Sequence, residues 1–186
     1  MQKSYVIGFP RIGEKRELKK VLEKYWAKQS DYSDVEYLAT QLKRRHWYYQ
    51  KEAKIDFISS NDFSLYDNVL DTSILLGAIP KRFEHLKNEE LYFAMARGND
   101  TCVAMEMTKW FNTNYHYIVP EISKDTKFNL NSKKVISEYN EAKQMGIDTK
   151  INLIGPITYL GLSKSIDNSD VFLHINSVVE VYKKLL

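Results

Sequence analysis

The chain has 186 residues, of which 44% are hydrophobic and 27% are charged, and its formal net charge is +3 at pH 7. These values are typical of a globular protein with one sizeable core, and so small a net charge gives no reason to expect a nucleic acid as partner. No apolar run approaches the ~18 residues of a membrane span, and a lone cysteine, Cys102, excludes an internal disulfide framework, so we expect a cytoplasmic protein without a membrane anchor.

Hydrophobic periodicity predicts an alternation of strands and helices. Short apolar runs that end at proline or polar residues predict four strands, over residues 4–10, 55–60, 115–119 and 151–154. Runs with apolar residues at i, i+3, i+4 and i+7 predict helices over residues 14–28, 35–53, 64–76, 89–96, 103–111 and 133–145. Residues 167–170 are expected to lead into a last helix that reaches residue 186. Residues 155–160 are expected to form a loop.

This order of elements predicts an α/β fold with a parallel sheet covered by helices. About four β/α units, each with a polar loop after its strand, fit half of a (β/α)8 barrel. A four-stranded open sheet is the alternative. The sequence ends on a crossover helix, so we expect a barrel that is incomplete in this chain.

Enzymes of both architectures carry their sites at the carboxyl ends of the strands. The polar residues expected there are Arg11 with Lys15, Asn61 with Asp62, Asn114 with His116, and Thr158 with Tyr159. This set favours binding of an anionic, polar ligand, and it contains no arrangement of nucleophile, base and orienting group.

The start of the first predicted helix carries the cations Lys15, Arg16 and Lys19. Positive charge at a helix N-terminus is unfavourable with respect to the helix dipole, unless an anion binds where the N–H groups point outward. The alternative is a solvated basic face on a surface helix.

The segment Met107–Glu121 combines Lys109, polar amides and four aromatic residues with an apolar run that ends at a proline. This pattern predicts a loop that enters a buried strand. We interpret Trp110–Phe111 as a core anchor rather than a stacking platform, and His116 as a hydrogen-bonded core histidine.

Metal and nucleotide sites are not indicated. The four histidines (46, 85, 116 and 174) lack metal-ligand spacing, and neither a G-x-G-x-x-G nor a P-loop motif is present. Cys102 is expected to be a small buried hydrophobic residue. Asp56 is expected either to be paired in the interior or to face solvent.

Five stretches occur in the order in which they occur in one known family. They are Gly8–Gly13 with Lys15–Lys20, Asp62–Asp67, Ala96–Gly98, Met107–Glu121 and Leu153–Tyr159. The run Lys109–Tyr117 is the most specific of them. Across nearly the whole chain they resemble the N-terminal domain of cobalamin-independent methionine synthase (5-methyltetrahydropteroyltriglutamate–homocysteine methyltransferase).

The resemblance implies an enzyme of two (β/α)8 barrels. The first barrel contributes to the folate site, and residues 1–186 are expected to be its N-terminal portion. The second barrel, absent from this chain, carries the zinc and the homocysteine site. The implied reaction moves a methyl group from 5-methyltetrahydropteroyltri-L-glutamate directly to L-homocysteine and gives L-methionine, with zinc and without cobalamin.

In the family, the segment that matches Lys15, Arg16, Glu17 and Leu18 and the lysine that matches Lys109 contact the folate polyglutamate. These five residues are therefore the predicted substrate-binding residues, with Asn114 a weaker candidate. The prediction agrees with the anion-binding interpretation because a triglutamate tail is a string of carboxylates. No catalytic residue and no metal ligand is expected in this chain.

The chain also departs from the family pattern. Ser59–Asn61 replaces an expected Pro-Val-Gly, and the loop between Gly98 and Ala104 is short. Without the second barrel, the 186 residues are expected not to catalyse methyl transfer alone. A stand-alone folate-binding or regulatory module is the alternative. Because a half-barrel leaves sheet edges and an apolar interior uncovered, we also expect the segment to self-associate.

Overall fold

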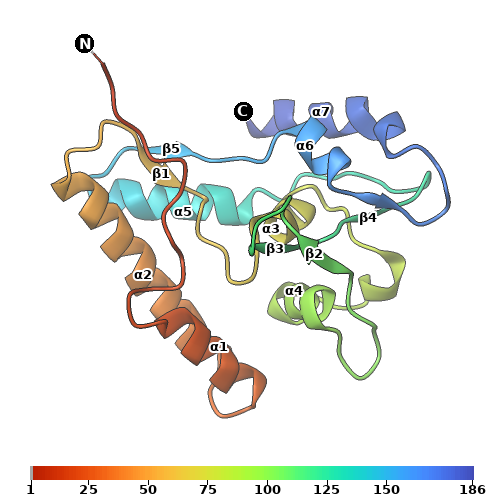
Figure 1. Cartoon of the computed structure of the whole chain (residues 1–186), viewed down its shortest axis with the longest axis horizontal. Helices are drawn as coiled ribbons and strands as arrows, with labels where there is room; N and C mark the ends of the chain where they lie inside the picture. The colour runs from red at the N-terminus through yellow and green to blue at the C-terminus, as the bar shows by residue number, and fades with distance from the viewer. Residues whose placement is uncertain (1) are drawn as a thin grey trace. The chain divides into compact units, whose positions relative to one another are not determined.

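The computed structural model describes residues 2–186 of this mixed α/β chain, which divide into two compact units (Figure 1). Unit 1 comprises the residues up to 65 together with residues 134–153, and unit 2 comprises residues 66–133 and 154–186. Each unit is therefore built from two separate stretches of the chain. None of the helices described is both long enough and apolar enough to cross a membrane.

Unit 1 combines helices with a small parallel sheet. Its elements are α1 (Glu17–Trp26), α2 (Tyr32–Glu52), β1 (Ile58–Ser60), nearly all of α5 (Lys133–Gln144) and β5 (Thr149–Ile151). β1 and β5 run parallel, with Ile58 opposite Thr149, and a parallel bridge joins Tyr5 to Phe57 just before β1. Three extended segments thus lie side by side.

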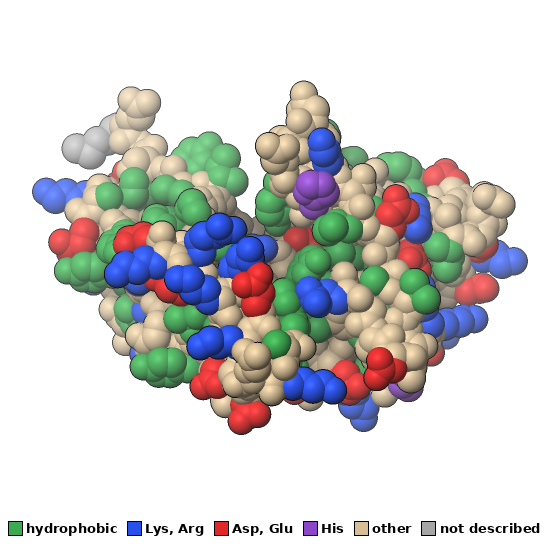
Figure 2. Space-filling model, turned by 60° about the horizontal axis from the view of Figure 1, so that its bottom comes forward, with side chains coloured by type: hydrophobic (Ala, Val, Ile, Leu, Met, Phe, Trp, Pro, Cys, Tyr) green, Lys and Arg blue, Asp and Glu red, His purple; other side chains and the backbone are tan. Residues whose placement is uncertain are grey.

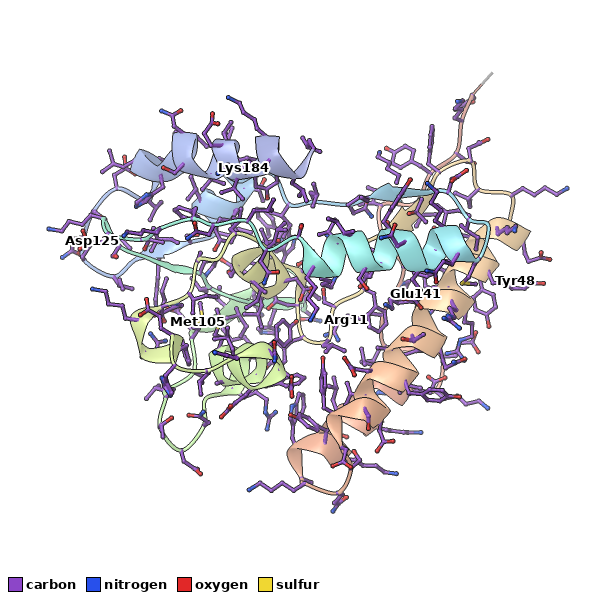
Figure 3. The ribbon with its side chains drawn as sticks, turned by 180° about the vertical axis from the view of Figure 1, so that it is seen from behind. Arg11, Tyr48, Met105, Asp125, Glu141 and Lys184 are labelled. Carbon is purple, nitrogen blue, oxygen red and sulfur yellow. The ribbon has the colours of Figure 1, made fainter. Side chains whose placement is uncertain are left out.

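The helices of unit 1 are held by apolar packing and by ion pairs. One core cluster comprises Trp47, Ile58, Ala142 and Ile147. Glu141 of α5 accepts hydrogen bonds from Lys43 Nζ at 2.7 Å and from Arg44 Nε at 3.2 Å (Figure 3). These contacts fasten α5 to α2 beside the sheet.

Unit 2 contains the remaining elements. Its helices are α3 (Asn68–Leu75), η1 (Lys81–Phe83), α4 (Asn88–Arg97), α6 (Pro156–Gly161), η2 (Val171–His174) and α7 (Ile175–Leu185). Its strands are β2 (Met107–Lys109), β3 (His116–Ile118), β4 (Glu121–Ile122) and β6 (Lys164–Ser165). β2 and β3 pair antiparallel, whereas β4 and β6 pair parallel. Met105, labelled in Figure 3, belongs to a core cluster with Leu70, Phe83, Met95 and Ile118.

The periodic segments form helices near the predicted positions. α1, α2, α3, α4 and α5 lie within or close to their predicted ranges, and η2 and α7 together cover the last one. Cys102 is buried, as predicted, and its Sγ donates a hydrogen bond to the carbonyl of Arg82 at 2.9 Å.

The helix predicted over residues 103–111 is wrong. Met107–Lys109 is strand β2, and Met105 N donates to the carbonyl of Met95 instead of entering a helix. A nine-residue run is short enough for its apolar spacing to fit a helix or a strand, and pairing with residues 116–118 decides the outcome.

The loop predicted over residues 155–160 is also wrong, because it contains helix α6. Pro156 stands at the first helical turn, where the N–H group that proline lacks would have had no partner within the helix. Tyr159 of α6 is fully buried, and its hydroxyl lies 3.0 Å from that of Ser73.

The prediction of one parallel sheet is wrong for residues 2–186. The strands pair two by two in three small sheets, and the predicted third strand contains β3, whose partner β2 runs antiparallel. The first predicted strand makes a single bridge at Tyr5. No closed barrel forms within the described residues, so the parallel β1–β5 and β4–β6 pairs are the part of the predicted arrangement that is present.

Candidate functional site

The segment before α1 is tied to the chain that follows β1. Asp62 Oδ2 accepts a hydrogen bond from Phe9 N at 2.7 Å, and Arg11 Nη1 donates to the carbonyls of Ser64 and Leu65 at 3.1 Å each (Figure 3). Arg11 and Asp62, both considered as ligand contacts, therefore hold the turn that places the start of α1.

Gly13 makes the predicted turn into α1. Its φ is +80°, a left-handed value that favours glycine. A Cβ at this position would lie 2.3 Å from Glu17 Oε2 and 3.0 Å from Leu42 Cδ2. The left-handed backbone therefore favours glycine, and a Cβ at this position would also have to displace the Glu17 carboxylate.

The Glu17 carboxylate lies at the N-terminus of α1. Its Oε2 accepts from Lys15 N at 2.8 Å and its Oε1 from Arg45 Nη2 of α2 at 2.9 Å. The hydrogen bond from Arg45 is the largest of the effects that lower the pKa of Glu17 to about 2. A carboxylate of the chain itself thus occupies this helix end.

The backbone N–H groups at this end already have acceptors. Arg16 N donates to the carbonyl of Gly13 at 3.0 Å, and Leu18 N donates to that of Ile12 at 3.2 Å. With Lys15 N bound to Glu17, the idea that these N–H groups point outward and free is wrong. An anion would meet the side chains of Lys15 and Arg16, which are both exposed.

The side chain of Leu18 is not available to a ligand, because it is fully buried in the core. Arg16, by contrast, is the N-cap residue of α1 with φ +58°, and its side chain is exposed. Together with the exposed Lys15, Lys19 and Lys20 it makes the start of α1 strongly basic. Figure 2 shows lysine and arginine side chains gathered on the face over this part of unit 1.

A cavity of about 290 Å³ lies between the turn and α2. It is lined by Phe9, Pro10, Gly13, Glu14, His46 and Tyr49. The Phe9 and His46 rings stack with their centroids 4.4 Å apart, and the Tyr49 hydroxyl donates to Glu14 at 2.9 Å. Burial lowers the pKa of His46, so its ring is neutral at pH 7. The cavity is mainly aromatic and lies next to the basic start of α1.

Lys109 is the last residue of β2 in a hairpin of unit 2. It is exposed and lies opposite His116 of β3. In the connecting loop, Trp110 N donates to the carbonyl of Tyr115 at 2.6 Å and Thr113 Oγ1 donates to that of Trp110 at 2.6 Å. The loop is therefore closed by local hydrogen bonds, and Lys109 stands at its base.

The hairpin tip is exposed rather than buried. The Phe111 side chain is 70% exposed at φ +52°, so the interpretation of this residue as a core anchor is wrong. His116 is exposed as well, with Nδ1 3.0 Å from the carbonyl of Asn114, and is not a core histidine. Burial begins one residue later, at Tyr117, and continues without a break to Ile122.

Asp67 fixes the base of the hairpin to α3. Its Oδ1 caps α3 by accepting from Val69 N at 2.7 Å and Leu70 N at 3.1 Å, and its Oδ2 accepts from Ile118 N of β3 at 3.1 Å. Burial is the main reason that the pKa of Asp67 is raised to about 7. Sequence reasoning assigned Asp67 no role, although an aspartate just before a helical run signals an N-cap.

Two further polar residues considered from the sequence, Asn61 and Asp56, form hydrogen bonds within the chain. Asn61 Nδ2 donates to the carbonyl of Asn152 at 2.8 Å, and its Oδ1 accepts from Lys134 Nζ at 2.9 Å. Asp56 accepts hydrogen bonds from the N–H and hydroxyl groups of Ser4 on an exposed face. Among residues 2–186 no group of three or more His, Cys, Asp or Glu side chains is placed to hold a metal ion.

The structure brings four of the five predicted residues together. Lys15, Arg16, Glu17 and Leu18 surround the start of α1 in unit 1, whereas Lys109 belongs to unit 2. Each group has its own supporting contacts, Arg45 on Glu17 in unit 1 and Asp67 on Ile118 N in unit 2.

A protein-family model described as the N-terminal domain of cobalamin-independent synthase matches residues 3–186. The chain belongs to this family.

Curated relatives of this cobalamin-independent synthase domain carry one name. The 5-methyltetrahydropteroyltriglutamate–homocysteine methyltransferase of Desulforamulus reducens is 60% identical over 185 residues, 98% of this chain and 24% of the relative. Methyltransferase 1 of that name from Oryza sativa subsp. japonica is 47% identical over 98% of this chain and 25% of its own length. The Xylella fastidiosa enzyme is 46% identical over 97% and 25%. The chain thus spans about a quarter of these relatives.

Sequence reasoning missed the residues that α2 contributes to this end of the synthase domain. Arg45 pairs with Glu17, and Tyr49, four residues later on the same helical face, pairs with Glu14. The i, i+4 spacing of an arginine and a tyrosine was the available signal. It did not indicate that α1 would lie alongside.

Proposed function

We propose that this chain forms the N-terminal portion of the first, folate-binding (β/α)8 barrel of a cobalamin-independent methionine synthase. The whole enzyme would transfer a methyl group from 5-methyltetrahydropteroyltri-L-glutamate to L-homocysteine in the cytoplasm. The family match over residues 3–186 carries this proposal, and relatives named for the same reaction support it. The parallel β1–β5 and β4–β6 pairs suit a portion of such a barrel.

The proposed role of this segment is to bind the glutamate tail of the folate. Lys15 and Arg16 present exposed cations at the start of α1, and Lys109 presents another beside the hairpin loop. Flexible lysines and a planar guanidinium suit the successive carboxylates of a triglutamate. Leu18 anchors the turn in the core.

Zinc is proposed for the whole enzyme, and residues 2–186 do not fit it. The described residues contain no cluster of His, Cys, Asp and Glu that would ligate it. We therefore assign zinc and the L-homocysteine site to the remainder of the enzyme, and expect the 186-residue chain to form no methionine in an activity assay.

The tail-binding role is tested by comparing 5-methyltetrahydropteroyl mono- and triglutamate in calorimetric titrations with the chain. The triglutamate should bind more tightly, and its advantage should shrink as salt screens the charges. Lys15→Ala and Lys109→Ala should each reduce the advantage about 3- to 10-fold. Lys24→Ala, which removes the same charge from the last turn of α1, is the matched control and should have little effect. Equal affinity for both ligands would remove the proposed role.

A stand-alone folate-binding module is the competing function. Capturing the protein from its own cells through this segment and measuring its intact mass separates the two. The synthase proposal expects a mass several times 21.9 kDa, whereas a product of 21.9 kDa would favour the module.

We also propose that the 186-residue segment self-associates. Tyr5 and Ile7 are 59% and 78% exposed beside the small parallel sheet of unit 1, and Phe57 is 40% exposed. Parallel sheets are ordinarily covered on both faces, so such side chains favour contact with a second copy. Light scattering at high micromolar concentration should show a dimer or larger species, and a clean monomer would refute this proposal.

A further inference from the structure

The start of α1 contains a carboxylate-binding arrangement that the chain fills itself. The Glu17 carboxylate bridges Lys15 N, at 2.8 Å, and Arg45 Nη2, at 2.9 Å. Gly13 leaves the space for it, because a Cβ there would come within 2.3 Å of Glu17 Oε2. The donors that hold Glu17 are the kinds of group that would hold a carboxylate of a ligand.

The charge of Glu17 opposes an anionic ligand. With its pKa lowered chiefly by the hydrogen bond from Arg45, Glu17 is ionised at every pH at which the protein would work. A ligand carboxylate that approaches Lys15 and Arg16 is repelled by the negative charge of Glu17. Glu17 is therefore a poor direct contact for a glutamate tail, although it lies among the predicted contacts.

Arg45 can donate more hydrogen bonds to a carboxylate than the one that it donates to Glu17. Its Nη2 donates to Glu17, whereas its Nε is buried and, among the described residues, has no acceptor. The Nε–Nη2 edge of a guanidinium can donate two parallel hydrogen bonds to one carboxylate. The Arg45 side chain as a whole is 34% exposed, and its Nη2 is the atom that Glu17 now holds.

We propose that Glu17 is an internal competitor for the anionic ligand, and that Arg45 is a further ligand-binding residue released when Glu17 is displaced. This inference rests on the proposed tail-binding function. A carboxylate of the glutamate tail takes over the Arg45 guanidinium, and Glu17 moves away from it towards solvent. Glu17 thereby lowers the affinity of the chain for the glutamate tail. Arg45 favours ligands with several carboxylates over those with one.

The deciding experiment compares Glu17→Gln with Glu14→Gln in titrations with 5-methyltetrahydropteroyltriglutamate and with γ-linked triglutamate. Both variants remove one negative charge beside α1, and both residues accept a hydrogen bond from α2, but only Glu17 holds Arg45. We expect Glu17→Gln to tighten binding about 5-fold and Glu14→Gln to change it by less than about 2-fold. Weaker binding by Glu17→Gln, or equal changes in both variants, would overturn the inference.

Arg45→Lys provides the second arm and keeps the positive charge. It should weaken triglutamate binding about 10-fold and monoglutamate binding much less, because an ammonium group cannot form the two-bonded pair. An equal loss for both ligands, or no loss, would contradict the role of Arg45. Circular dichroism and urea unfolding identify any variant that fails to fold, and Arg45→Lys alone then decides the result.

Failure of the inference and failure of the proposed function give different results. If the unmodified chain does not prefer triglutamate to monoglutamate, the tail-binding function fails and the inference fails with it. If the preference exists but Glu17→Gln weakens it, the function stands and only the competitor role of Glu17 is lost.

Discussion

The turn before α1 and the hairpin of β2 and β3 both carry predicted binding residues, yet they are held by different forces. Side chains from distant parts of the sequence fix the turn, through Arg45 on Glu17 and Asp62 on Phe9 N. The hairpin loop is closed by hydrogen bonds within residues 110–115, and a single buried carboxylate, Asp67, ties its base to α3. The stability of the turn should therefore depend on substitution of its charged residues and on salt, whereas the hairpin loop should depend less on both.

The turn and the hairpin each contain a residue with a left-handed backbone conformation, and the surroundings of these two residues also differ. Gly13, at φ +80°, is surrounded by Glu17 and Leu42, whereas Phe111, at φ +52°, projects from the hairpin tip. A side chain added in the crowded turn would have to displace the Glu17 carboxylate or the Leu42 side chain. Strain at an exposed tip involves few neighbours.

The largest effect is expected from Gly13→Ala. The added Cβ would collide with Glu17 Oε2 and force a left-handed backbone on alanine, so the free energy of unfolding should fall by about 3 kcal/mol in urea titrations. Gly155→Ala is the control, because Gly155 has φ −69° and no atom lies within 4 Å of its added Cβ. Equal effects in the two variants would mean that the turn is not crowded.

Asp67→Ala should have the next largest effect. Three buried N–H groups, those of Val69, Leu70 and Ile118, lose their acceptor, and the free energy of unfolding should fall by about 2 kcal/mol at pH 5. Hydrogen exchange measured by NMR should show faster exchange at Ile118 N–H. Unchanged protection there would show that β3 does not depend on this carboxylate.

The same carboxyl group should make stability depend on pH. The pKa of Asp67 rises from 3.8 to about 7 on folding, chiefly through burial, with the nearby charge of Asp71 adding to the rise. The folded chain therefore binds the proton more tightly than the unfolded chain does. The stabilisation is fully present below pH 3.8 and is lost as the pH rises towards 7.

Asp67→Asn removes this titration and is the reference for it. The stability of the unmodified chain relative to this variant should decline by about 2 kcal/mol between pH 5 and 7. Tyr92, whose hydroxyl donates to Asp71 at 2.7 Å, has its pKa raised well above 10, so it does not titrate in this range. Parallel pH profiles for the two proteins would contradict the assignment.

The smallest effect is expected from Phe111→Asn. Asparagine adopts the left-handed conformation more readily than phenylalanine does. However, the substitution loses the edge-on contact between the Phe111 and Trp110 rings, whose centroids lie 5.3 Å apart. These effects oppose each other, so stability should change by less than about 0.5 kcal/mol. A loss of several times this value would mean that the exposed tip contributes to the core.

The sequence by itself determined helices α1 to α5 and α7, the turn at Gly13 and the family. Each of these depends on neighbouring residues: the apolar spacing of α1, the backbone freedom of one glycine, and the order of short motifs such as Lys109–Tyr117. The four candidate residues at the start of α1 are consecutive, so placing them together required no knowledge of the fold.

Only the tertiary structure decided how the strands pair and which charges meet. Residues 107–109 became a strand because residues 116–118 lay beside them, and β1 paired with β5, about 90 positions later in the chain. The contact of Arg45 with Glu17 spans 28 residues and depends on α1 packing along α2. Long-range pairing depends on which surfaces are buried together, a property of the whole folded chain that no local pattern of residues contains.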